Sequence, residues 1–171
     1  MKTVLLVGCF LAAFPLVSRS EDLAPMPVKA TFLITGLHCA PCTRTVESSL
    51  RRVAGIRAVQ VDWRSKNATI EFDEAQLSAG AIAQRIASTP HMMGRNMRYG
   101  GWLALHVDEI ADKKRAEDAK AGLSKVPGVT QVVTYPEQSS VGIKFDGTGK
   151  LTTGELIKAL EAAGFKAANL K

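Results

Sequence analysis

Hydrophobic residues follow two kinds of spacing along the first hundred residues. The stretches RAVQVDW (57–63) and ATIEF (68–72) alternate apolar and polar residues, which is typical of half-buried strands. Val46, Leu50 and Val53 recur at the spacing of one helix face. The pattern predicts strands at 29–36, 56–63 and 67–73 and a short strand at 95–99, with helices at 40–53 and 79–88.

The second half of the chain repeats this order of elements. Strands are predicted at 102–108, 129–135, 140–145 and 165–169, and helices at 111–125 and 153–163. At an offset of 73 residues the framework positions coincide without a gap: Phe32 with Leu105, Ile34 with Val107, Leu50 with Leu123, Val53 with Val126, Gly55 with Gly128, Ile70 with Ile143 and Phe72 with Phe145. One inserted residue in DGTGK raises the offset to 74. The chain is therefore an internal duplication.

Each repeated unit has the order βαββαβ, which is the order of a ferredoxin-like fold. We therefore expect an α+β protein of two tandem ferredoxin-like units, at 29–99 and 102–171, joined closely through Gly100 and Gly101. Thr152 and Glu155 have the spacing of a capping box at the last helix.

The N-terminus is different in character from both units. Residues 1–20 combine a basic start, an apolar stretch and small residues before Glu21, which is typical of a secretory signal peptide. We expect cleavage after Ser20, loss of Cys9 with the signal, a linker at 21–28 and export to the periplasm. Cleavage also removes Lys2 and Arg19, which leaves 20 basic and 16 acidic residues, a charge of +4. So small an excess, on an exported protein, argues against a nucleic-acid partner.

The candidate chemistry lies in one unit only. After cleavage the chain keeps two cysteines, Cys39 and Cys42, and the repeat aligns them with Asp112 and Arg115. Because the second unit has the same framework without thiols, the cysteines are not needed for folding. A small secreted domain that depends on disulfides usually has several pairs, so this single pair indicates a functional role.

The position of the cysteines favours the thiolate form. They lie where the first strand gives way to the first helix, with Pro41 suited to the first helical turn. The unpaired N–H groups and the dipole of a helix start stabilise negative charge and lower a thiol pKa. Two thiolates satisfy Cu(I) or Hg(II), whereas structural zinc requires four ligands. The sequence therefore predicts a site for one soft metal ion, with Cu(I) first and Hg(II) next.

The segment GLHCAPC (36–42) resembles the GMxCxxC loop of heavy-metal-associated domains, which occur in copper chaperones, metal-pumping ATPases and the periplasmic mercury-binding protein. Leu37 replaces the usual methionine, a volume-conserving change. The resemblance implies that Cys39 and Cys42 hold the metal and pass it by thiolate exchange. It also implies a metal-transporting membrane protein or another metal carrier as the partner.

The resemblance draws attention to a second loop, which in this family faces the metal loop. It reads STPHMMGRNM (88–97) in the first unit, and at the offset of 74 His91 aligns with Phe165. Imidazole and thioether are both copper ligands. His91, Met92 and Met93 are therefore predicted as auxiliary metal ligands, with core packing as the alternative.

Other functions remain open at the level of sequence. CAPC at a helix start is also how thioredoxin-like sites begin, so a thiol–disulfide oxidoreductase is the alternative to a metal carrier, and an inert disulfide is a third possibility. We identify no nucleophile–base arrangement and no phosphate-binding glycine loop, so we expect neither an enzyme nor a small-molecule substrate. We expect His38 to be a solvent-exposed loop residue and His106 to be a structural residue of its strand.

Overall fold

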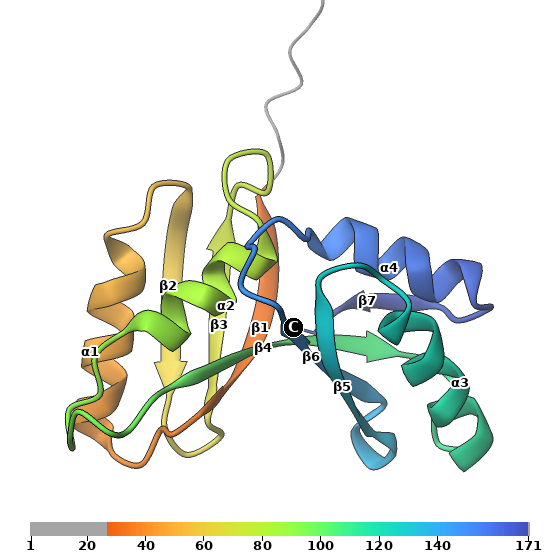
Figure 1. The fold of residues 1–171 in the computed structure, drawn as a ribbon, viewed down its shortest axis with the longest axis horizontal. Helices are drawn as coiled ribbons and strands as arrows, with labels where there is room; N and C mark the ends of the chain where they lie inside the picture. Colours follow the sequence, from red (N-terminus) through yellow and green to blue (C-terminus); the bar gives the residue numbers. More distant parts are fainter. Residues whose placement is uncertain (1–26, 171) are drawn as a thin grey trace, which may run out of the picture.

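The computed structural model describes residues 27–170. The predicted signal peptide 1–20, Cys9 and all but the end of the predicted linker lie outside these residues. The structure is α+β, with four helices and seven strands that form a single sheet (Figure 1).

The elements follow one another in two rounds of the same order. The first round comprises β1 (Val28–Thr35), α1 (Ala40–Arg51), β2 (Ile56–Asp62), β3 (Asn67–Phe72) and α2 (Ala79–Ser88). The second comprises β4 (Gly100–Val107), α3 (Lys113–Ser124), β5 (Val129–Tyr135), the short 3₁₀ helix η1 (Pro136–Gln138), β6 (Ser140–Phe145), α4 (Thr153–Ala162) and β7 (Ala167–Asn169). Nearly all predicted elements are present, with ends that differ by up to two residues.

The sheet has the strand order β2-β3-β1-β4-β6-β5, and β7 also pairs with β4. All its pairings are antiparallel. On one edge of β4, residues 100–104 pair with β1 and residues 105–107 pair with β7. The strands around β4 therefore form two overlapping ferredoxin-like arrangements that have this strand in common.

This shared strand corrects two predictions. The expected strand at 95–99 is wrong, because that segment forms a loop closed by a single bridge between Pro90 and Arg98. Gly100 and Gly101 are not a connection between two units but the first residues of β4. The start of β4 supplies the missing edge strand of the first unit, and its remainder serves as the first strand of the second.

Gly101 has a packing reason to be glycine. A Cβ atom there would lie 2.8 Å from the Ala83 carbonyl oxygen and 2.9 Å from the Ala83 Cα in α2. Real Cβ atoms do not approach other heavy atoms so closely, so the strand can pass under α2 only without a side chain. A glycine pair that is typical of a turn in the sequence is here a point of close packing.

One face of the sheet carries the core. Phe32 in β1 lies opposite Leu103 in β4, both are fully buried, and alternate residues along each strand point to the same face. Leu105 and Val107 continue that face into the second unit, under α3 and α4. Within residues 27–170, no helix has both the length and the apolar character needed to cross a bilayer.

Polar contacts join the two halves on the helix side. The Glu74 carboxylate accepts hydrogen bonds from the Thr153 amide at 2.5 Å and from its hydroxyl at 2.8 Å, at the start of α4. The Gly80 amide donates to the Leu151 carbonyl at 3.0 Å. These contacts bring the connection between β3 and α2 against the connection between β6 and α4, its counterpart in the second unit.

Capping residues define the helix starts. Thr152 and Glu155 form the predicted capping box of α4, and the hydrogen bonds from Thr152 lower the pKa of the Glu155 carboxyl. Ser78 caps α2 and Asp112 caps α3 through their side chains. Helix α1 is different, because its N-cap residue is Cys39 and its side chain makes no capping hydrogen bond.

Candidate metal centre

The loop between β1 and α1 turns sharply at Gly36. This residue has φ +81°, which favours glycine, and a Cβ would lie 2.5 Å from the Arg98 carbonyl oxygen. The next side chain, Leu37, is 1 % exposed and packs in the core. The turn therefore anchors the loop, and His38 and Cys39 follow at the surface end of the sheet.

The two cysteines lie on the first turn of α1. Their Cα atoms are 5.3 Å apart, and the structure joins their sulfur atoms in a disulfide. Cys42 is fully buried and Cys39 is half-buried. The Cys42 amide donates to the Cys39 carbonyl at 3.0 Å. Because the side chains adjoin one another without rearrangement of the backbone, one small ligand can contact both sulfurs.

The second loop, residues 89–99, lies against the first through His91. The His91 ring is 9 % exposed, and its Nε2 is 2.9 Å from the Gly36 carbonyl oxygen. The Met93 amide donates to Nδ1 at 3.1 Å. Since Nδ1 accepts that hydrogen bond, Nε2 carries the proton and donates to Gly36. Both ring nitrogens are therefore engaged with backbone groups, and ligation of a metal requires one of these bonds to break.

Aromatic contacts surround the His91 ring. Its centroid is 4.4 Å from that of Tyr99 and 6.0 Å from that of His38. Burial raises the pKa of the Tyr99 phenol. The Tyr99 hydroxyl makes no hydrogen bond within residues 27–170. The ring of His91 is thus fixed between the metal loop and a buried aromatic residue.

The remaining predicted auxiliary residues are exposed. Met92 is 57 % exposed and Met93 is 63 % exposed. The sequence prediction that this loop faces the cysteine loop agrees with the His91–Gly36 contact, whereas ligation by His91, Met92 or Met93 stays a prediction. His106 lies on the far part of β4, where Nε2 is 3.0 Å from the Asp108 carboxylate.

A basic groove runs between α1 and α2 beside the cysteine loop. It has a volume of about 510 Å³, and its walls include Arg44 of α1, Arg52 just after the end of α1, Arg85 of α2, Pro41 and Met92. None of these three arginines forms an ion pair within residues 27–170. The sequence analysis missed this groove. Arg44 in α1 and Arg52 at its C-cap are eight residues apart, a spacing visible in the sequence, but only the fold brings Arg85 into the same groove.

The second unit fills the corresponding place with charged side chains. Asp112, which aligns with Cys39, accepts a hydrogen bond from the Arg115 amide at 3.0 Å and caps α3. The Arg115 guanidinium lies 4.2 Å from the Phe165 ring centroid and donates to Glu109 at 2.9 Å and to the Gly164 carbonyl at 3.2 Å. In place of two sulfurs, the second unit therefore has a capping carboxylate at Asp112 and an arginine at Arg115 that pairs with exposed Glu109.

Comparison with known proteins agrees with the location of the cysteine site in the first unit. The sequence model of the heavy-metal-associated domain matches residues 31–91. Over 59 residues the chain is 32 % identical to the copper chaperone CopZ of Enterococcus hirae, covering 34 % of this chain and 86 % of CopZ. It is 25 % identical over 152 residues to copper-transporting ATPase 2 of Rhizobium meliloti, covering 86 % of this chain. The chain spans only 17 % of that ATPase.

Two solved structures have low similarity to this chain. Oxidized MerP from Ralstonia metallidurans CH34 is 23 % identical, with a TM-score of 0.38 over 45 % of this chain and 96 % of MerP. The N-terminal soluble domains of Bacillus subtilis CopA are 18 % identical, with a TM-score of 0.41 over 84 % of this chain and 93 % of the CopA fragment.

Proposed function

Because the chain belongs to the heavy-metal-associated domain family, we propose that it is an exported carrier of one soft metal ion, Cu(I) first and Hg(II) next. The metal is held between the Sγ atoms of Cys39 and Cys42 and passed to another protein. The observation that carries this proposal is the sulfur pair on the first turn of α1, in the matched segment 31–91. Export rests on the sequence pattern of residues 1–20.

The geometry suits a two-coordinate soft cation. Metal–sulfur bonds of about 2.3 Å place the two sulfurs about 4.6 Å apart in a linear site. Side chains on one helical turn, with Cα atoms 5.3 Å apart, reach this separation by rotation about χ1. The N–H groups and the dipole at the start of α1 stabilise the thiolates. The N-cap residue is Cys39 itself, and α1 has no side-chain capping hydrogen bond that would compete with this interaction.

The oxidised form described here and the metal-bound form exclude each other. Reduction of the disulfide takes up two electrons and two protons, and binding of Cu(I) by the two thiols then releases two protons. The cargo therefore enters only the dithiol. On this proposal the protein is a carrier rather than an enzyme.

The basic groove supports a particular kind of partner. Arg44, Arg52 and Arg85 lie on the wall that also includes Pro41, the residue next to Cys42. A partner with carboxylates facing this groove would neutralise the arginines while its own metal site approaches the cysteines. We infer that the metal-transporting membrane protein or carrier that receives the ion has an acidic contact surface. A cross-linked partner whose contacting surface is basic would contradict this inference.

A thiol–disulfide oxidoreductase is the second candidate. The observation that favours it is the disulfide itself, with Cys39 half-exposed at a helix start. The two functions make different demands on the protein. A carrier binds Cu(I) stoichiometrically when reduced, whereas an oxidoreductase reduces a test disulfide such as insulin and has an oxidising potential.

The test is a competitive titration of the reduced protein with Cu(I), Hg(II) and Zn(II), read by mass spectrometry. We expect one Cu(I) or Hg(II) per chain and at least a 100-fold loss of affinity in Cys39→Ser and in Cys42→Ser, beyond the roughly 10–100-fold effect of losing an outer-shell partner. Asp112→Ser and Arg115→Ser are matched controls, because they occupy the equivalent positions of the second unit. Absence of soft-metal binding by the reduced protein, together with insulin reduction, would show that the oxidoreductase is the right assignment.

A further inference from the structure

Methionine has an uneven distribution along this chain. The sequence contains five methionines, Met1, Met26, Met92, Met93 and Met97, so three of them fall within six residues. The buried core of residues 27–170 includes no methionine, although flexible thioethers usually fill irregular gaps in cores. All the methionines of the described residues are instead in the loop that faces the cysteines.

Packing does not explain the two exposed methionines. Met92 and Met93 are 57 % and 63 % exposed, and Trp63 is the one other large hydrophobic residue that is exposed within residues 27–170. Burial of a methionine side chain is worth about 1.5–3 kcal/mol relative to exposure. Met92 and Met93 therefore gain little of this burial energy, and small or polar residues would serve equally well at these positions if the loop had only a structural role.

The backbone of this loop is ordered by hydrogen bonds rather than by its methionines. His91 Nδ1 accepts from the Met93 amide at 3.1 Å, and the Met97 amide donates to the Gly94 carbonyl at 3.2 Å. The ends of the loop meet at the bridge between Pro90 and Arg98. Two successive turns therefore fold the segment back on itself and bring three thioethers within a short loop.

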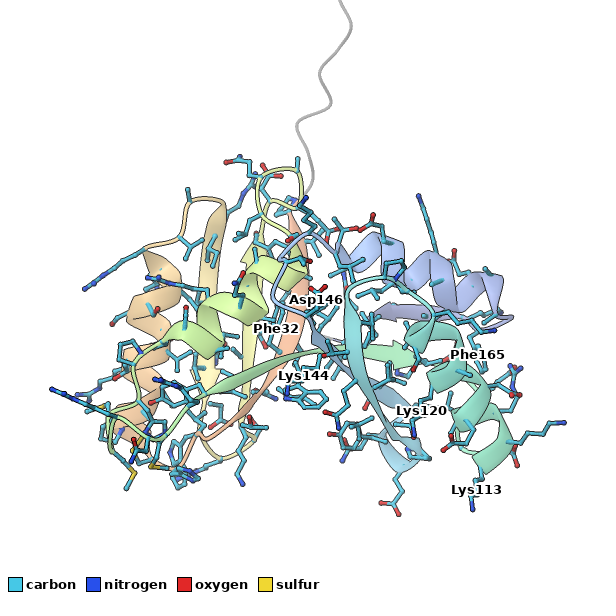
Figure 2. All side chains as sticks on the ribbon, viewed as in Figure 1. Phe32, Lys113, Lys120, Lys144, Asp146 and Phe165 are labelled. Atoms are coloured by element: carbon cyan, nitrogen blue, oxygen red, sulfur yellow. A yellow bond between two sulfur atoms is a disulfide. The ribbon has the colours of Figure 1, made fainter. Side chains whose placement is uncertain are left out.

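The same loop is fixed beside the cysteines. His91 Nε2 donates to the Gly36 carbonyl at 2.9 Å, and Met92 shares the wall of the basic groove with Pro41, which lies between Cys39 and Cys42. Figure 2 shows the sulfur atoms gathered at one end of the molecule, at the lower left of the view. The thioethers and the cysteine sulfurs thus lie at a common end.

Thioethers differ from thiolates in two ways that matter here. A methionine sulfur is neutral and has no proton to lose, and it is not consumed when a disulfide forms. Its softness selects Cu(I) or Ag(I) over Zn(II) and other hard cations. Because both nitrogens of His91 are engaged, the ligands that this loop presents are sulfur atoms.

We propose that Met92, Met93 and Met97 form a second site, a thioether site for Cu(I), which stays open while Cys39 and Cys42 are joined in a disulfide. It gives the protein a means to hold a soft monovalent cation in an oxidising compartment, next to the cysteine pair. This inference rests on the proposed soft-metal cargo, but not on the redox state of the cysteines.

The experiment uses the oxidised chain from Glu21 onward, which contains every residue of the described fold. The probe is Ag(I), because it has the soft character of Cu(I) and does not donate an electron to the disulfide. Binding is measured by titration calorimetry, and the methionine ε-methyl groups are followed by ¹³C NMR. We expect one Ag(I) per chain and shifts of the Met92, Met93 and Met97 methyl groups, with Met26 unshifted as the internal control.

The matched variants keep side-chain volume and remove sulfur. We expect Met92→Leu/Met93→Leu to lose at least tenfold in Ag(I) affinity, and Met97→Leu to lose at least threefold, with unchanged unfolding midpoints because the loop is ordered by backbone hydrogen bonds. The proposal is wrong if oxidised wild type binds no Ag(I), if the double variant binds as tightly as wild type, or if the Met26 methyl shifts as much as the others.

A parallel titration of the reduced protein separates this inference from the proposed function. Cu(I) binding by the reduced chain, with no Ag(I) binding by the oxidised chain, would refute the thioether site alone. Ag(I) binding by the oxidised chain, with no added Cu(I) capacity on reduction, would support the thioether site and refute the cysteine site.

Discussion

At the scale of single residues, His91 links the two loops of the candidate centre. Imidazole is a possible metal ligand, but in this structure the ring holds the two loops together. One ring nitrogen donates to Gly36 and the other accepts from Met93. The ring also contacts Tyr99, with centroids 4.4 Å apart. Removal of the imidazole would therefore disturb the position of the cysteine loop at Gly36, whether or not His91 binds the metal.

We expect His91→Ala to lower the free energy of unfolding by about 2–4 kcal/mol, because it leaves the Gly36 carbonyl and the Met93 amide without partners and creates a cavity beside Tyr99. Urea unfolding measures this change. His106→Ala is the control, because His106 is partly exposed and pairs with exposed Asp108, and it should shift stability by less than about 0.5 kcal/mol.

The same variant decides the role of the imidazole. If His91 only holds the two loops together, the Cu(I) affinity of reduced His91→Ala stays within tenfold of wild type. A loss of 100-fold or more, with the fold intact, would identify His91 as a metal ligand.

At the scale of elements, the packing of β4 under α2 determines where the first unit ends. Gly101 passes within contact of the α2 backbone, and residues 100–104 of β4 pair with β1. A strand with any side chain at this position could not approach α2 so closely. The edge of the first unit therefore depends on one residue without a Cβ.

We expect Gly101→Ala to destabilise the protein by about 1–3 kcal/mol, since the added methyl would lie 2.8 Å from the Ala83 carbonyl oxygen. Denaturant unfolding measures the change. The matched control is Gly154→Ala in the first turn of α4, where the nearest atom to a Cβ is 3.8 Å away. Alanine should be neutral or stabilising there by up to about 1 kcal/mol, and equal destabilisation by both changes would contradict the packing argument.

At the scale of the whole molecule, the two repeats form one sheet rather than two. The order β2-β3-β1-β4-β6-β5 runs through both, and β4 contributes to the core of each (Figure 1). The Glu74–Thr153 contact adds a second connection on the helix side. The second unit thus completes the first, which gives it a structural role whether or not it contacts a partner.

We expect a fragment that ends at residue 99 to lack cooperative unfolding, because it leaves one edge of β1 unpaired and uncovers the core around Phe32 and Ile34. A fragment that ends at residue 107 regains β4 and should recover protection of the β1 amides. Circular dichroism during urea unfolding and amide hydrogen exchange measure both. Cooperative folding of the shorter fragment, with the β1 amides as protected as in the full chain, would show that the units are independent.

Residues near one another in sequence determined much of this protein. Apolar periodicity located the helices and nearly all strands within two residues of their ends, the offset of 73 revealed the duplication, and the spacing of Cys39 and Cys42 placed the sulfur pair at a helix start. These features depend on local backbone preference and on side chains one or two turns apart, so a single stretch of sequence contains the information.

Tertiary structure alone decided the rest. The shared strand β4, the contact of His91 with Gly36 and the meeting of Arg85 with Arg44 all join segments that are tens of residues apart. The strand prediction at 95–99 was wrong because the pattern shows which residues can form a strand, but not which strand will fill a free sheet edge. That outcome depends on competition between pairings across the whole fold, where close packing at Gly101 favours β4.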